Sequence, residues 1–201
     1  MAVSATKKVA LFIEGAAIHA AAKALGFDID YKRLLTAFES SGTILRAFYY
    51  IRIVEDQDYT SLRPLVDWLD YNGYTVVAKS TREFADPGSQ RRAKTGISVE
   101  LCVDAMELAG YIDQMVLFSG DADFRALVEA MQRRGVRVTV VSTVASQPMM
   151  IADELRRQAD VFVDLAGLRP SIERQGSDRT ALRELRFQRR NTASRSDGNE
   201  E

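Results

Sequence analysis

Short apolar runs alternate with longer segments of helical periodicity along most of the chain. Runs of apolar, β-branched or aromatic residues indicate strands, whereas apolar residues three or four positions apart indicate helices with one buried side. The pattern predicts strands at residues 9–13, 43–54, 74–78, 115–118, 136–141 and 161–163. It predicts helices at residues 16–24, 31–39, 56–71, 98–109, 124–131 and 149–158. Strands that alternate with helices are typical of an α/β fold with a mainly parallel sheet covered on both faces.

Acidic residues directly follow two of the predicted strands. Glu14 ends the first strand, and Asp121 and Asp123 come after the strand at residues 115–118 and the break at Ser119-Gly120. Because the carboxyl ends of parallel strands point to the same edge of a sheet, we expect these acids to converge there. A helix N-cap explains one aspartate in such a turn. It does not explain two.

Carboxylates gathered at one edge raise each other's pKa values unless a cation lies between them. Ligand sets made only of oxygen favour Mg²⁺ or Mn²⁺. Such ions typically serve phosphoryl chemistry, where they generate a hydroxide and stabilise the leaving oxygen. The residues alone leave two interpretations open, which are a capped turn with a surface acid and a divalent-cation site.

The composition and the glycine pattern exclude several other kinds of site. A single cysteine, Cys102, and a single histidine, His19, exclude an internal disulfide and a Cys/His zinc site. Gly15 has no second glycine at dinucleotide-binding spacing, and no P-loop is present. A phospho-acceptor receiver domain would need an acidic pair after its first strand, where Glu14 stands alone.

Length and charge bound the remaining possibilities. The 201 residues, of which 46% are hydrophobic, suit one domain with some spare length. The net charge of −1 means that any attraction for nucleic acid is local. No stretch approaches the roughly 20 apolar residues of a membrane span, and Glu14 interrupts the opening apolar run. We therefore expect a cytoplasmic protein that does not contact a membrane.

Two polar segments fall outside the alternation of strands and helices. Residues 80–93 read as a loop with Arg91 and Arg92 near its end, and Lys94 follows it. The apolar pattern fails after about residue 169. We expect one domain over residues 1–168 and a disordered, arginine-containing tail over residues 169–201. The arginines of this tail either keep the chain soluble or touch RNA.

Three motifs together resemble a known family. They are residues 12–17 (Phe-Ile-Glu-Gly-Ala-Ala), Lys94 followed by a helix that holds Asp104, and residues 119–124 (Ser-Gly-Asp-Ala-Asp-Phe). This combination resembles the NYN domain and, more closely, the LabA-like (DUF88) branch of the PIN-like nucleases, over roughly residues 7 to 168. The resemblance implies a PIN-like three-layer α/β/α sandwich and a metal-dependent ribonuclease that hydrolyses RNA phosphodiester bonds through clustered carboxylates.

The resemblance also implies roles for individual residues. The expected catalytic acids, which would also be the ligands of Mg²⁺ or Mn²⁺, are Glu14, Asp104, Asp121 and Asp123. The expected contacts to RNA are Lys94, Arg91 and Arg92.

Three positions depart from the family pattern. Glu14 replaces an aspartate and moves the carboxylate outward by about 1.5 Å. Ala17 replaces an asparagine, and Ser98 replaces an aspartate at the start of a helix. A ribonuclease with an altered site and a catalytically weak or inactive RNA-binding or regulatory protein therefore both stay open. So does a homo-oligomer or a complex with another protein.

Overall fold

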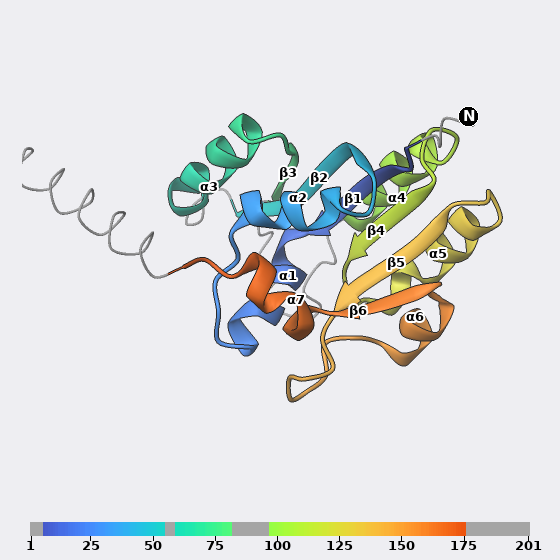
Figure 1. Cartoon of the computed structure of the whole chain (residues 1–201). Coiled ribbons are helices and arrows are strands. Elements are labelled where there is room, and N and C mark those ends of the chain that lie inside the picture. The colour runs from blue at the N-terminus through green and yellow to red at the C-terminus, as the bar shows by residue number, and fades with distance from the viewer. Residues whose placement is uncertain (1–5, 55–58, 82–96, 176–201) are drawn as a thin grey trace, which may run out of the picture.

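The computed structural model describes residues 6–54, 59–81 and 97–175. Within these ranges, six parallel strands form one sheet in the order β3-β2-β1-β4-β5-β6 (Figure 1). The strands are β1 (Lys8–Glu14), β2 (Thr43–Val54), β3 (Thr75–Thr81), β4 (Gln114–Phe118), β5 (Arg137–Ser142) and β6 (Val161–Asp164). The predicted α/β fold with a parallel sheet is confirmed, and the two strands that precede the acidic residues, β1 and β4, are the central pair.

Helices cover both faces of the sheet. One face carries α1 (Gly15–Ala24), α2 (Tyr31–Glu39), α3 (Tyr59–Tyr71) and α7 (Leu165–Ile172). The other carries α4 (Ile97–Leu108), α5 (Arg125–Gln132) and α6 (Asp153–Gln158). Figure 1 shows α1, α2 and α7 in front of the strands, with α4 and α5 behind them. This arrangement is the predicted three-layer sandwich.

The side chains of β1 explain why the sheet needs both helical layers. Leu11 and Ile13 pack in the core on the α1 side, and Ala10 and Phe12 pack in the core on the α4 side. All four side chains are completely buried. A strand without a solvent-exposed face reads as a continuous apolar run, which is the pattern of parallel strands.

The helix predicted at residues 149–158 begins later than expected. In the structure, α6 starts at Asp153, and the preceding backbone makes other hydrogen bonds. The Met150 amide donates to the Thr143 carbonyl at 3.0 Å, and the Ala152 amide donates to the Gly120 carbonyl at 2.9 Å. These bonds attach the segment to the turn after β4, so the predicted start of this helix was wrong.

A helix that the sequence pattern did not predict follows β6. α7 continues past residue 168, the expected end of the domain, and its last residue, Ile172, is completely buried. Arg33 of α2 donates to the carbonyl oxygens of Glu173 at 2.7 Å and Pro170 at 2.9 Å. The chain is therefore packed on the domain as far as Glu173. The expected disorder of residues 176–201 lies outside the described residues.

No helix in the described ranges is long and apolar enough to cross a membrane.

Candidate functional site

Glu14 and Asp121 are joined through one serine at the carboxyl ends of the two central strands. β1 and β4 pair in register up to Ile13 and Phe118, so Glu14 and Ser119 follow at neighbouring positions. The Ser119 hydroxyl donates to Glu14 Oε2 at 2.6 Å and accepts from the Asp121 amide at 3.2 Å. Glu14 and Asp121, which are 107 residues apart in the sequence, are therefore brought to the same edge of the sheet.

The turn that holds Asp121 requires glycine at the preceding position. A Cβ atom on Gly120 would lie 1.7 Å from the carbonyl oxygen of Met150. Asp121 then caps the short 3-10 helix η1 (Ala122–Phe124), because its Oδ1 accepts from the Asp123 amide at 3.0 Å. The capping interpretation therefore accounts for Asp121. Asp123 is exposed in the first turn of η1.

Asp104 reaches the same face of the sheet from α4. Its Oδ2 accepts a hydrogen bond of 2.8 Å from the hydroxyl of Tyr50, a completely buried residue of β2. Tyr50 is the register partner of Glu14 on the neighbouring strand, so Glu14 and the Tyr50–Asp104 pair lie on the α4 side. Burial, and then the hydrogen bond to Asp104, raise the pKa of Tyr50. The hydroxyl therefore remains a proton donor to Asp104.

An ion pair lies one helical turn before Asp104. Lys79 Nζ of β3 is 2.7 Å from Glu100 Oε1 of α4, and the two side chains are 37% and 38% exposed. Glu100 therefore already has a cationic partner. Sequence reasoning did not single out Lys79 or Tyr50, because it does not give the register that brings β2 and β3 beneath α4. Their positions near the ends of predicted strands were the available signal.

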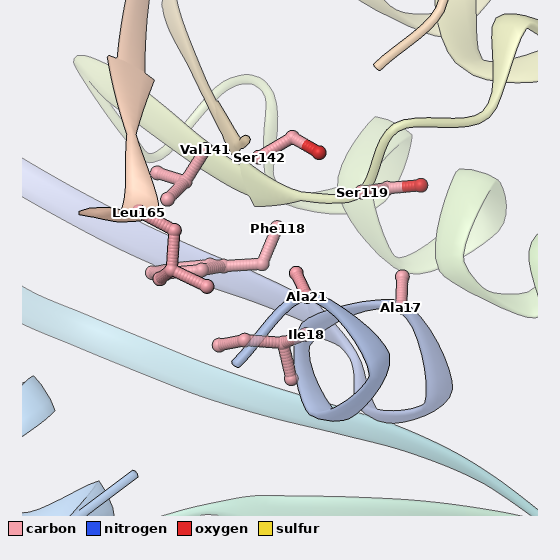
Figure 2. A pocket seen from close by; sticks show the side chains of 8 residues that line it. All are labelled: Ala17, Ile18, Ala21, Phe118, Ser119, Val141, Ser142 and Leu165. Carbon is pink, nitrogen blue, oxygen red and sulfur yellow. The ribbon is translucent and has the colours of Figure 1, made fainter. Parts of the chain in front are cut away.

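Ala17 and Ser98, where the resemblance implies an asparagine and an aspartate, lie on α1 and α4. Ala17, on the first turn of α1, lines a pocket of about 10 Å³ together with Ser119 and Ser142. Figure 2 shows the Ala17 methyl group on α1 beneath Ser119. Such a volume holds about one water molecule. Ser98 is partly exposed in the first turn of α4. Because Ala17 and Ser98 have neither a carboxylate nor an amide in their side chains, neither residue adds such a group to the edge.

The acids at this edge fit a divalent cation in part. In the part of the chain that the structure describes, no three or more His, Cys, Asp or Glu side chains form a group that could hold a metal ion. The donor chemistry nevertheless fits Mg²⁺ or Mn²⁺, because the acids at the edge offer only carboxylate oxygens. Mg²⁺ is commonly bound by one or two carboxylates together with waters and substrate phosphates. The edge therefore fits an ion that shares its coordination with a substrate rather than one held by protein alone.

The expected RNA contacts Lys94, Arg91 and Arg92 lie outside the described residues.

Comparisons with known proteins agree with the fold. A model of the NYN domain matches residues 8–166. The low amplitude and bright protein LabA of Synechococcus elongatus is 33% identical over 171 residues, covering 83% of this chain and 88% of LabA. The crystal structure of a protein of unknown function from Vibrio parahaemolyticus matches with a TM-score of 0.67 and 27% identity. That match covers 82% of this chain and 96% of the Vibrio protein.

Proposed function

Because this chain belongs to the NYN domain family, we propose that it is a ribonuclease with an altered site, acting on RNA at the carboxyl edge of its sheet. Family membership supports a nuclease or RNA-related role. The observation that carries the finer proposal is the hydrogen-bonded link from Glu14 through Ser119 to Asp121. It holds two acids at the edge of an α/β sheet where ligands bind.

The proposed ligands of Mg²⁺ or Mn²⁺ come from Glu14, Asp104, Asp121 and Asp123, and one or two of these carboxylates would bind the ion together with waters and an RNA phosphate. A bound ion of this kind would supply an acidic water and would neutralise charge on the leaving oxygen. Ser119 fixes one oxygen of Glu14, which leaves the other oxygen to bind the ion or to take a proton from the attacking water. Tyr50 fixes one oxygen of Asp104 in the same way. Lys94, Arg91 and Arg92 would hold the RNA phosphates.

Asp121→Asn tests the proposed activity. Asparagine is as good an N-cap as aspartate, so the turn is preserved while the charge is lost. We expect cleavage of a mixed-sequence RNA with Mn²⁺ to fall at least about tenfold. The matched control is Asp153→Asn, since Asp153 lies at the start of α6 in a surface ion pair with Arg157. The control should cleave at the wild-type rate.

Two results would contradict this proposal. One is the absence of Mn²⁺-dependent cleavage by the wild-type protein at high concentration. The other is an equal loss in Asp121→Asn and in the Asp153→Asn control, because a general effect of removing surface charge would then explain the result.

A second candidate function is that of an NYN protein that binds RNA or regulates a partner without cleaving. Two observations favour it. No three or more acids of the described residues form a group that could hold a metal ion, and Ala17 and Ser98 lack the polar groups of the family pattern. On this view the fold and the RNA-binding surface are kept, and the cation site is lost.

Restoring the family residues tests the second candidate. The triple variant Glu14→Asp, Ala17→Asn and Ser98→Asp should create or greatly raise cleavage, because it returns one charge and one amide to the edge. The matched control carries Asn instead of Asp at position 98 and so lacks the charge. A triple variant no more active than the parent would remove the support for a lost cation site.

The proposal also covers the RNA contacts, the location and the oligomeric state of the chain. Lys94, Arg91 and Arg92 are proposed RNA contacts, and a cytoplasmic location is proposed with RNA as the partner. Sedimentation velocity at several protein concentrations would show whether the chain forms a homo-oligomer.

A further inference from the structure

Two basic residues lie side by side at the carboxyl ends of β2 and β3. Arg52 and Lys79 are register partners in these parallel strands. Paired residues of adjacent strands project to the same face, and Lys79 projects toward α4, where it contacts Glu100. Arg52 therefore lies on the α4 side of the sheet as well, two residues beyond Tyr50 on the same strand.

The position of this pair relative to the acids follows from the strand register. Glu14 pairs with Tyr50, and Tyr50 pairs with Val77, so these residues form one row across β1, β2 and β3. Arg52 and Lys79 form the next row on that face. With a rise of about 3.3 Å per residue, this row is roughly 7 Å nearer the open edge. A polyanion bound at the acidic edge would continue over these two residues.

The side chains of Arg52 and Lys79 are accessible to a ligand, and the ion pair between Lys79 and Glu100 is exposed to solvent and therefore weak. Arg52 is exposed, and Lys79 and Glu100 are both more than one-third exposed. Exposed ion pairs contribute little to stability. RNA phosphates release counterions when lysine or arginine neutralises them, so a phosphate can replace Glu100 as the partner of Lys79.

We propose that Arg52 and Lys79 form a binding site for the RNA phosphate backbone, with which the Glu100 carboxylate competes. The proposal rests on the proposed function, because RNA is taken as the ligand. It adds a path for the RNA from the acidic edge across β2 and β3. It also predicts opposite effects of two neighbouring substitutions, since Lys79 attracts the phosphate and Glu100 repels it.

Binding of a fluorescently labelled, mixed-sequence single-stranded RNA, measured by anisotropy, tests this site. EDTA is present, so that neither cleavage nor a cation contributes. Arg52→Gln and Lys79→Gln should each weaken binding about three- to tenfold and reduce the slope of log K against log salt by about 0.7. Glu100→Gln should strengthen binding, and the combined Lys79→Gln and Glu100→Gln variant should lose that gain.

Arg46→Gln is the matched control. Arg46 is exposed on β2 like Arg52, but it lies six residues nearer the amino end, about 20 Å away. Its removal should leave RNA affinity and the salt slope unchanged. Equal losses for Arg46→Gln and Arg52→Gln would overturn the site, because attraction would then follow net charge alone.

Two further outcomes separate this inference from the proposed function. RNA binding by the wild type with unchanged affinity in Arg52→Gln and Lys79→Gln would overturn the phosphate site and leave the proposed function standing. No RNA binding by the wild type at low salt, either with EDTA or with Mn²⁺ and a non-cleavable RNA, would overturn both.

Discussion

The Tyr50 hydroxyl keeps its proton because burial and the hydrogen bond to Asp104 both raise its pKa. It therefore donates a hydrogen bond that orients one carboxylate oxygen of Asp104. Tyr50→Phe removes this donor and keeps the ring. Because partners of metal ligands commonly affect affinity 10- to 100-fold, we expect Mn²⁺ affinity to fall about tenfold, measured by calorimetry with a non-cleavable RNA present.

A second buried tyrosine gives the control for this prediction. The Tyr74 hydroxyl donates to the Tyr31 carbonyl at 2.7 Å on the α2 side of the sheet. Tyr74→Phe loses a comparable hydrogen bond, worth about 1 kcal/mol, without touching the acidic edge. It should bind Mn²⁺ as the wild type does. Unchanged Mn²⁺ affinity in Tyr50→Phe would show that the hydroxyl serves only stability.

Sequence reasoning reached some residues of the edge and missed others for a physical reason. Glu14 and Asp121 could be placed at one edge because both directly follow apolar strands, and parallel strands share their carboxyl end. Tyr50 and Lys79 could not be found in this way. Their contacts with α4 depend on strand order and register, which local periodicity does not encode.

At the scale of single elements, the strands and the longer helices were predictable, whereas the short helix α7 was not. β2 is found at its predicted residues because β-branched and aromatic side chains fill it. α7 is only eight residues long and contains Pro170, which argues against a helix in a sequence pattern. Its stability comes from tertiary packing, since Ile172 is buried against the core and Arg33 binds the backbone that follows.

α4 shows how one element can serve both the core and the site. One face of α4 is buried in the core and consists of Ile97, Leu101 and Ala105, which are spaced four residues apart. Glu100 and Asp104, also four residues apart, form a second face toward the carboxyl edge, where each contacts a strand side chain. The helix therefore fixes the acidic face relative to the sheet. Substitutions on that face change charge at the edge without opening the core.

At the scale of the whole molecule, the strand order places the acids and the basic pair on one continuous edge. β1 and β4 lie in the centre of the sheet with Glu14 and the turn to Asp121, and β2 and β3 extend the edge toward Arg52 and Lys79. The net charge of −1 gives no overall attraction for RNA. The proposed binding of RNA must therefore come from this local arrangement, and it should depend strongly on salt.

Paramagnetic relaxation by Mn²⁺, measured on the amide signals of the full chain with a non-cleavable RNA present, tests the central claim most directly. We expect the amide signals of Glu14, Asp104 and residues 119–123 to lose intensity first, and those of Lys8, Arg46 and Arg137 at the opposite edge to persist. Loss of intensity centred on the opposite edge, or no selective loss at any Mn²⁺ concentration with RNA bound, would contradict the account.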